Sequence, residues 1–373
     1  MTVLSIDPTL KIAVLGAAGG IGQSMTLLLK TQLHTLIPRD ASDDSRVRKN
    51  HIHLALYDVN SDAVKGVTTD LSHIDTPVTL SSHSPADANG MRDCLINTDL
   101  IIISAGMPRQ PGMTRDDLFF KNAAIVSSLA DSIAKYCDLS NVFILLISNP
   151  VNSLVPVMAK RLIHDRPSTD IEKRIMGVTK LDIVRASTFL HQLVIDEGIQ
   201  KRTNDMPELP VIGGHSGNTI IPLFSRSAAY SNLSKQQLRN LITRVQTGGD
   251  EVVKAKNGQG SATLSMALAG YKVVAKFASL LLGTTDSIHG IYYVSLWDHL
   301  KNKPICDGAG DVLEKIDGCQ FFSIPVYISK GGIYNVEYDI LDKMDTYERD
   351  TLLPLCLSNL KVNIDTGLSF NPK

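Results

Sequence analysis

A chain of 373 residues with 43% hydrophobic and 20% charged residues has the composition of a soluble globular protein, long enough for two domains. A formal net charge of −1 gives no electrostatic reason to expect nucleic acid or an anionic membrane as a partner. The five cysteines show no CxxC spacing, which favours a reducing compartment and speaks against a disulfide framework or a metal site.

The first predicted element is a buried strand at residues 12–15, followed by glycines and an apolar helix. Gly16, Gly19 and Gly22 are spaced three residues apart, and the apolar helix resumes at Met25. Glycines at a strand-to-helix turn let a pyrophosphate approach the backbone N–H groups and the positive helix end. Glycine triplets also occur in ordinary turns, but this placement favours a dinucleotide site.

A second strand, over residues 52–58, ends in an acid. It follows a charged, non-periodic stretch at 34–50 that predicts a solvated loop. Asp58 is the residue type that binds the ribose of NAD, although it lies 36 residues past Gly22 instead of about 20 after the motif. The long loop at 34–50 accounts for the additional residues between Gly22 and Asp58. The alternative is an aspartate that caps the next turn, but its place at a strand end favours the ribose role.

The first half continues as strands that alternate with helices. Mostly apolar strands in such an order predict an α/β fold with a doubly wound parallel sheet, in a domain over residues 11–177. The remaining predicted elements of this half are a helix at 62–74, strands at 100–104 and 142–148 with a helix at 117–136 between them, and a last strand at 175–177.

The second half, residues 178–370, mixes helices with strands and predicts an α+β domain with antiparallel pairs. Ser234 and Gln237 predict a capping box at one helix start. The longest apolar stretch contains Lys272 and Lys276, which predicts an amphipathic helix and not a membrane span. The predicted helices are 181–195, 235–256, 262–282 and 346–362, and the strands 211–212, 290–296 and 321–328.

Two arginines follow the strand at 100–104. Arg109 and Arg115 lie in a Gly/Pro-rich stretch at a strand end, where open α/β sheets place their ligands, and they suit capture of an anion. A solvated basic loop, with Thr114 and Asp117 opening the next helix as a capping box, is an equally supported interpretation.

Polar residues also follow the last two strands of the first half. Asn149 could cap the next helix, or bind a ligand from its strand end. Thr179 and Asp182 fit a capping box. However, Asp182 and Arg185 are three residues apart and share a helix face, as a carboxylate that orients a base beside a substrate-binding guanidinium would require.

The candidate base is His215, in the glycine-flanked stretch 213–217. Histidine is the side chain whose ordinary pKa best suits proton exchange at neutral pH. The flanking glycines allow a substrate to approach closely, but they are equally typical of a plain turn.

Together these stretches resemble the NAD-dependent malate dehydrogenases of the lactate/malate dehydrogenase family, over almost the whole chain. The similarity is greatest to the mitochondrial-type branch. The N-terminus has neither a signal nor a transit peptide pattern, so we expect a cytoplasmic form of that branch. The loops at 34–50 and 198–210 are longer than in the family. The motifs that carry the resemblance lie at 16–23, 111–118, 147–153, 177–182, 213–217 and 260–267.

The resemblance implies a Rossmann domain, an α+β catalytic domain and a role for each site residue. His215 would be the general base, with Asp182 holding its other nitrogen. Arg185 would bind the C1 carboxylate and Arg109 the second carboxylate. The remaining roles are carried over in the same way: Arg115 would polarise the C2 oxygen, Asn149 would lie near that oxygen and the cofactor, and the NAD site would comprise Gly16, Ala17, Ala18, Gly19, Gly20, Ile21, Gly22, Asp58, Asn122, Ile147 and Met266.

The implied activity is the reversible NAD-dependent oxidation of (S)-malate to oxaloacetate by hydride transfer. The implied assembly is a homodimer, with the helix at 62–74 near the interface. Two alternatives remain at this point: another 2-hydroxy-acid dehydrogenase of the same family, or a catalytically silent NAD-binding protein.

Overall fold

The fold is organised by one large mixed sheet, whose strand order is β3-β2-β1-β4-β5-β6-β9-β12-β7-β8, with β13 added against β12. The computed structural model describes residues 8–37, 49–107, 115–165, 169–199, 206 and 208–372, without the side chains of Arg115 and Asp165. The predicted loop at 34–50 and that at 198–210 therefore lie largely outside the described residues.

The first six strands of this sheet run parallel, which confirms the predicted doubly wound sheet. β4 and β5 form its centre and are wholly buried, as their uninterrupted apolar sequences require. The elements of the first half are β1 Thr9–Leu15, α1 Gly20–Gln32, β2 His51–Tyr57, α2 Ser61–Ser72, β3 Thr79–His83, α3 Gly90–Leu95, β4 Leu100–Ile103, α4 Arg115–Tyr136, β5 Phe143–Leu146, α5 Val151–Asp165 and β6 Ile175–Gly177.

The second half continues the same sheet in antiparallel pairs, as predicted. β9 pairs with β6 and β12, and β12 pairs with β7. The elements are α6 Lys180–Asp196, β7 Val211–Gly213, β8 Ile220–Pro222, α7 Lys235–Ala255, α8 Leu264–Leu282, β9 Ile288–Ser295, β10 Trp297–Asp298, β11 Lys303–Pro304, α9 Ala309–Lys315, β12 Phe321–Ser329, β13 Gly332–Val336, a π-helical turn Glu348–Leu352 and α10 Leu353–Ser369.

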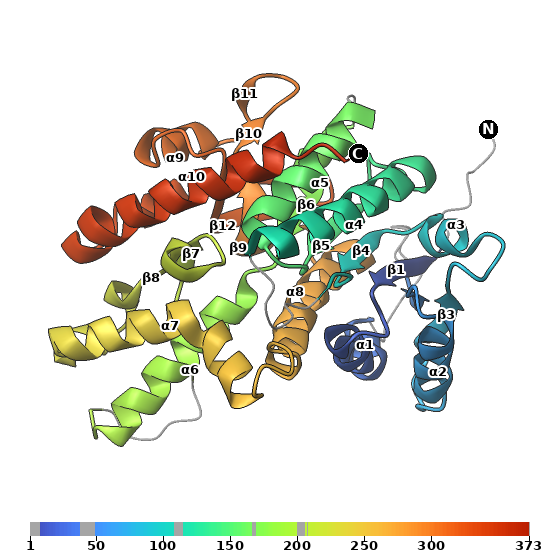
Figure 1. The fold of residues 1–373 in the computed structure, drawn as a ribbon, viewed down its shortest axis with the longest axis horizontal. Helices are drawn as coiled ribbons and strands as arrows, with labels where there is room; N and C mark the ends of the chain where they lie inside the picture. Colours follow the sequence, from blue (N-terminus) through green and yellow to red (C-terminus); the bar gives the residue numbers. More distant parts are fainter. Residues whose placement is uncertain are drawn as a thin grey trace.

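Helices from both halves pack together on the sheet. α8 packs against α1, and α10 packs against α5, which in turn packs against α4 (Figure 1). α6 and α7 form an antiparallel pair, and α6 also packs against α8. The predicted capping box begins α7. Each half therefore covers part of the other, and the site lies where they meet.

The predicted end of the last helix, at residue 362, is wrong: α10 continues to Ser369. Polar residues at 363, 365 and 366 hide the apolar periodicity in this segment. Ile364 is nevertheless buried, and Gly367 packs so tightly that a Cβ there would lie 2.2 Å from the Ser153 carbonyl oxygen. Contact with α5 extends the helix beyond what its sequence pattern predicts.

By length and composition alone, α8 is long and apolar enough to cross a membrane. However, half of its most apolar segment is buried inside the protein. This is the burial expected of a core helix. Lys272 and Lys276 lie on its exposed side, as the predicted amphipathic helix requires.

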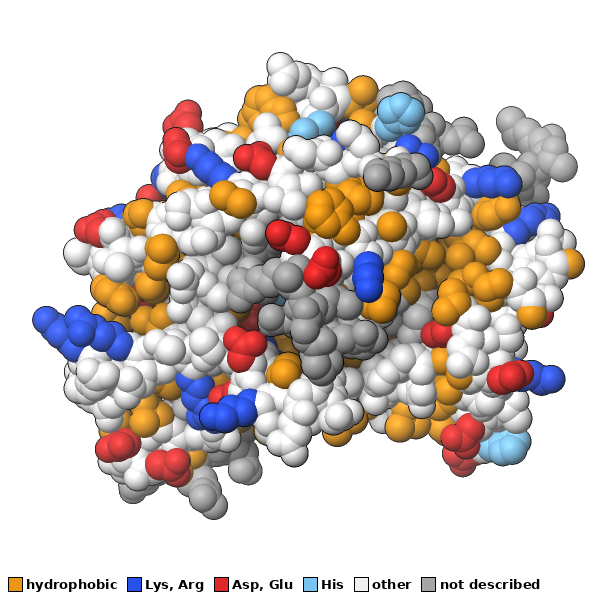
Figure 2. Space-filling view, viewed as in Figure 1, with side chains coloured by type: hydrophobic (Ala, Val, Ile, Leu, Met, Phe, Trp, Pro, Cys, Tyr) orange, Lys and Arg blue, Asp and Glu red, His pale blue; other side chains and the backbone are white. Residues whose placement is uncertain are grey.

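On the face of the molecule drawn in Figure 2, side chains of both charge signs are interspersed.

An ion pair joins the two halves away from the sheet's centre. His299 Nδ1 lies 2.6 Å from Oε1 of the buried Glu172, and His299 Nε2 lies 3.0 Å from Gln320 Oε1. Burial acts to lower the pKa of His299, but the hydrogen bonds and charge of Glu172, with help from Gln320 and Asp298, outweigh it and raise the pKa.

We expect this pair to make stability depend on pH. Because the folded protein raises the pKa of His299, the stabilisation is complete below the unfolded value of about 6.5 and is lost as the pH rises through the folded pKa. The loss in unfolding free energy caused by His299→Gln should therefore be larger at about pH 5.5 than at about pH 9, measured by urea denaturation. An equal loss at both pH values would contradict this assignment.

Candidate active site

The turn between β1 and α1 is tight enough to require its glycines. Gly16 has φ +89°, and a Cβ there would lie 2.5 Å from the Ala105 nitrogen. A Cβ on Gly22 would lie 2.2 Å from the Gly16 carbonyl oxygen, whereas one on Gly19 would meet only that oxygen, at 3.4 Å. No side chain caps the N-terminus of α1, so its first N–H groups are available to an anion. This cradle, which a Cβ would fill, fits the pyrophosphate of a dinucleotide.

Asp58 lies directly against this cradle. Its Oδ2 accepts a hydrogen bond of 2.9 Å from the Ala18 N–H, and its Oδ1 accepts one of 3.1 Å from the Asn60 N–H. The turn-capping interpretation is therefore correct in part, because the Asp58 carboxylate accepts a hydrogen bond from Asn60 in the turn that follows β2. The same contacts hold the carboxylate beside the glycine turn, as the ribose role also requires.

Two other predicted cofactor residues lie directly after β5 and in the first turn of α8. Ile147 and Met266 are buried, and a Cβ on Gly270 of α8 would lie 3.3 Å from Ile147 Cδ1. The start of α8 also reaches the glycine turn, since a Cβ on Gly20 would lie 3.0 Å from Thr263 Cγ2. The structure therefore brings the motif at 260–267 to the cradle. Of the remaining predicted residues, Ala17 is buried, and Ala18 and Ile21 are half-buried.

Asn122, on α4, ties two strand ends together. Its Nδ2 donates to the Asn149 carbonyl oxygen at 2.7 Å, and its Oδ1 accepts from the Met107 N–H at 2.7 Å. The side chain of Asn149 is exposed at the end of β5. Asn122 is 2% exposed, and both atoms of its amide group are hydrogen-bonded to backbone. It therefore has a structural role that the sequence did not reveal.

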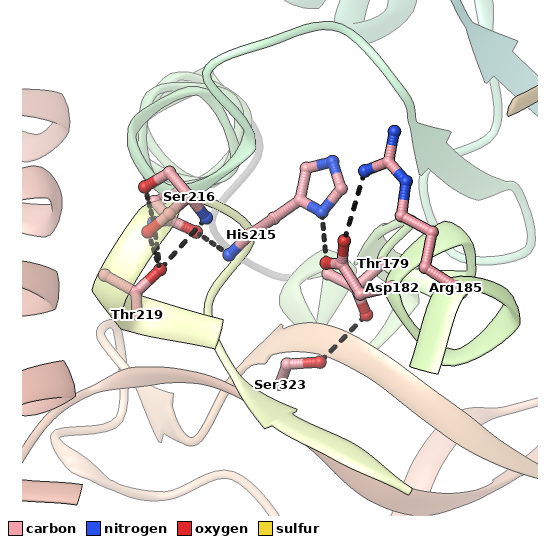
Figure 3. Close-up of polar contacts among 8 residues, drawn as sticks. Thr179, Asp182, Arg185, His215, Ser216, Thr219 and Ser323 are labelled. Atoms are coloured by element: carbon pink, nitrogen blue, oxygen red, sulfur yellow. Dashed lines mark hydrogen bonds and ion pairs between the residues drawn. The ribbon is translucent and has the colours of Figure 1, made fainter. Parts of the chain in front are cut away.

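The catalytic candidates converge on one carboxylate. Asp182, in the first turn of α6, is 0% exposed, and its Oδ2 lies 2.5 Å from His215 Nδ1. Its Oδ1 forms no hydrogen bond within the described part of the chain and lies 3.7 Å from Arg185 Nη1 (Figure 3). Asp182 thereby selects the tautomer with a proton on Nδ1 and leaves Nε2 as the acceptor that a general base needs.

Burial lowers the pKa of Arg185, while the charges of Asp182 and Glu251 act to raise it. A guanidinium remains charged at neutral pH despite such a shift. With its side chain only 12% exposed, Arg185 is a partly desolvated cation beside a proton acceptor. This combination suits a substrate that carries both a carboxylate and an exchangeable proton.

The predicted capping box of Thr179 with Asp182 is wrong. The Thr179 side chain makes no capping hydrogen bond and lies 2.9 Å from Ser323 Oγ on β12 instead (Figure 3). The Asp182 side chain is engaged by His215, so the tertiary contact overrides the local capping rule.

The loop that carries His215 is held by Asn152, which is 1% exposed and was not singled out in the sequence. Asn152 Oδ1 accepts from the His215 N–H at 2.8 Å. Its Nδ2 donates to Ser216 Oγ at 3.0 Å, Thr219 Oγ1 at 3.2 Å and Asn363 Oδ1 at 3.0 Å. One buried amide therefore links α5 of the first half to the loop and to α10 of the second.

The glycine before the histidine is explained by this amide. A Cβ on Gly214 would lie 2.8 Å from Asn152 Oδ1 and 2.6 Å from Thr219 Oγ1. The sequence left open whether these glycines admit a substrate or make a turn; at Gly214 the structure shows close internal packing. Two predicted substrate residues are not placed: Arg109, and the side chain of Arg115, lie outside the described residues.

Comparison with known proteins gives matches over both halves. The model of the lactate/malate dehydrogenase NAD binding domain matches residues 10–177, and that of the lactate/malate dehydrogenase alpha/beta C-terminal domain matches residues 179–371. A cytoplasmic malate dehydrogenase of Saccharomyces cerevisiae is 59% identical over 97% of this chain and 95% of its own length. A mitochondrial malate dehydrogenase of the same yeast is 40% identical over 96% of this chain and 93% of its own length.

Solved structures show the same fold at low sequence identity. The malate dehydrogenase of Picrophilus torridus superimposes with a TM-score of 0.70 at 20% identity, covering 96% of this chain and 97% of its own. That of Cryptosporidium parvum gives a TM-score of 0.68 at 23% identity, covering 97% of this chain and all of its own.

We expect Asn152→Ala to destabilise the protein by about 3 kcal/mol, because it removes a buried amide and the hydrogen bonds that the amide makes to the His215 loop and to α10. Urea denaturation measures the change, with Asn240→Ala, at an exposed position of α7, as the matched control. A loss no larger than that of the control would show that Asn152 does not hold the His215 loop.

Proposed function

The chain belongs to the lactate/malate dehydrogenase family, and on that premise we propose that it catalyses the reversible NAD-dependent oxidation of (S)-malate to oxaloacetate. The 59% identity to a malate dehydrogenase over 97% of the chain supports this activity. That similarity does not favour a different 2-hydroxy-acid substrate or a silent NAD-binding protein. The observation that carries the mechanism is the 2.5 Å contact between His215 Nδ1 and Asp182.

In malate oxidation His215 Nε2 accepts the proton of the C2 hydroxyl. NAD, when bound, supplies the acceptor for the hydride that leaves C2. As the imidazole becomes positive, the adjacent carboxylate of Asp182 stabilises it without further rearrangement. In the reverse direction His215 returns the proton, so the C2 oxygen need not become a free alkoxide.

Arginines give the site its specificity in this proposal. Arg185 binds the C1 carboxylate through two parallel hydrogen bonds, for which a planar guanidinium is better suited than an ammonium. Arg109 binds the second carboxylate, Arg115 polarises the C2 oxygen, and Asn149 lies beside that oxygen and the cofactor. The exposed side chain of Asn149 and the 3.7 Å between Arg185 and Asp182 support the placement of the substrate between the ends of β5 and α6.

The cofactor residues are those of the glycine turn, residues 16–22, with Asp58, Asn122, Ile147 and Met266. A ribose attached to a pyrophosphate in the cradle would meet Asp58, whose carboxylate lies 2.9 Å from the Ala18 nitrogen. A 2′-phosphate would bring negative charge against that carboxylate. We therefore expect a preference for NAD over NADP.

We propose that the boundary between two functional domains follows residue 177. Residues 11–177 would bind the cofactor, and residues 178–370 would bind and convert the substrate. The change of matching family model between residues 177 and 179 supports it. The similarity to a cytoplasmic yeast enzyme supports a cytoplasmic location. The finer placement in the mitochondrial-type branch rests on the residues of the motifs alone, because the identity is 59% to the cytoplasmic yeast enzyme and 40% to the mitochondrial one.

We also propose a homodimer that buries α2. This helix exposes Gly66 at its middle, and no described atom lies within 4 Å of the position of a Cβ there. The open groove around Gly66 is lined by Asp62, Lys65, Asp70 and His73. A helix surface without a side chain at its centre allows another helix to approach closely.

Steady-state kinetics with two coenzymes and two 2-oxo acids tests the activity. We expect oxaloacetate to be preferred to pyruvate roughly 5- to 150-fold in kcat/KM, because a monocarboxylate leaves Arg109 without a partner, at a cost of ~1–3 kcal/mol. NADH should likewise be preferred to NADPH. Arg109→Gln should narrow the gap between the two acids. Comparable NADH consumption with both acids in the unsubstituted protein would refute the assignment.

For the assembly, light scattering should give a mass twice the 40.6 kDa of one chain. Gly66→Lys, which places a long charged side chain at the middle of α2, should shift the protein toward the monomer mass. Gly249→Lys is the matched control, because Gly249 is also a glycine within a helix, α7, and no described atom lies within 4 Å of a Cβ placed there. A monomer in the unsubstituted protein, or a Gly66→Lys variant that remains dimeric, would exclude an interface at α2.

A further inference from the structure

α7 crosses the side chain of Arg185 at a glycine. A Cβ on Gly248 would lie 3.0 Å from Arg185 Cδ, 3.1 Å from Nε and 3.5 Å from Cζ. Gly248 is buried. The next residue, Gly249, is also glycine, yet no described atom lies within 4 Å of a Cβ placed there.

The two glycines are equally unfavourable for the helix but differ in what surrounds them. Glycine inside a helix is destabilising relative to alanine, because more backbone freedom is lost on folding. Neither Gly248 nor Gly249 has a positive φ that would require glycine. At Gly248 a methyl group fits only if the Arg185 side chain moves by a few tenths of an ångström, whereas at Gly249 the described surroundings impose no such limit.

α7 is held against its neighbours in the turn that precedes this contact. One turn before Gly248, the Arg244 guanidinium lies over the Phe189 ring of α6 at 3.9 Å, and it also pairs with Glu251 at 3.1 Å. Phe189 is one turn beyond Arg185 on α6, so the two contacts stack along the antiparallel helix pair. Gln246 Nε2 further donates to the Ile220 carbonyl oxygen at 3.0 Å. A methyl group at Gly248 would therefore displace the Arg185 side chain more readily than the helix.

Arg185 also has a fixed neighbour on its other side. Asp182 Oδ1 lies 3.7 Å from Arg185 Nη1, and Asp182 is itself held by His215 at 2.5 Å. The guanidinium thus lies between the backbone of α7 and the carboxylate that orients the base. A shift of a few tenths of an ångström would change its position relative to the imidazole.

We propose that Gly248 is a positioning residue: its missing side chain sets the guanidinium of Arg185 where it can bind the substrate carboxylate in line with His215. This inference rests on the proposed role of Arg185 in substrate binding. It assigns to α7 a part in substrate specificity, although Gly248 itself touches no substrate.

The effect of Gly248 should appear in substrate binding and not in folding. Two parallel hydrogen bonds to a carboxylate depend on the position and tilt of the guanidinium plane. A misplacement of about 1 Å near the reacting groups can cost ~10²-fold. We therefore expect Gly248→Ala to raise the KM for oxaloacetate roughly tenfold, with the KM for NADH unchanged.

Gly249→Ala is the matched control. Both substitutions add one methyl group and raise helix propensity, so both variants should unfold at the same or a higher temperature than the unsubstituted protein. Only Gly248→Ala should change the KM for oxaloacetate. Equal KM values for the two variants would overturn the proposal.

Arg185→Lys separates this inference from the proposed function. A large rise in the oxaloacetate KM for Arg185→Lys supports the substrate role; no rise would refute that role and the proposal with it. In the double variant, Gly248→Ala should add little, because the slimmer lysine leaves room for the methyl group. A full additional tenfold rise in the double variant would show that Gly248 acts independently of Arg185. If Gly248→Ala alone does not fold, the comparison of the double variant with Arg185→Lys still tests the proposal.

Discussion

The buried carboxylate of Asp182 is the group on which the rest of the site depends. Removing a carboxylate from water costs several kcal/mol unless partners replace its hydration. His215 supplies a hydrogen bond of 2.5 Å and Arg185 a positive charge at 3.7 Å, so both must converge on the first turn of α6. The same arrangement serves the proposed chemistry, since the carboxylate is in place before His215 gains a proton. Folding and the proposed catalysis therefore require the same arrangement of these three residues.

The sheet meets this demand by continuing across both halves. Asp182 follows β6 and His215 follows β7, and the strand order β6-β9-β12-β7 holds the ends of the two strands at a fixed separation. β9 and β12 occupy the gap as a long antiparallel pair. Asn152 then fixes the His215 loop from α5. The two halves consequently act as one framework at the site.

Much of the fold could be predicted from local sequence, but not the elements whose surroundings are unusual. β4 and β5 are uninterrupted apolar runs, and α2 and α7 show clear periodicity. The sequence indicates only the start of α5, as the helix that Asn149 could cap. Its extent escaped prediction because the helix is buried on nearly every side and contains Pro156, so it has no single apolar stripe. β3 escaped because it is polar: Thr79 and Ser81 hydrogen-bond to His53 on β2 and do not enter the apolar core. Both depend on neighbours that are distant in sequence.

The same limit applies at the site. The sequence identified Asp182, Arg185 and His215 because each belongs to a motif with a chemical purpose at short range. It gave no role to Asn152 or Gly248, although Asn152 contacts His215 and Gly248 contacts Arg185, in each case 63 residues away along the chain. A glycine inside a helix is destabilising, so its presence is informative, but the sequence cannot tell Gly248 from Gly249. The two glycines differ only in their surroundings, because the Arg185 side chain of the neighbouring helix lies against Gly248 and not against Gly249. In the proposed mechanism, substrate specificity depends on a side chain that is absent as well as on the arginine that is present.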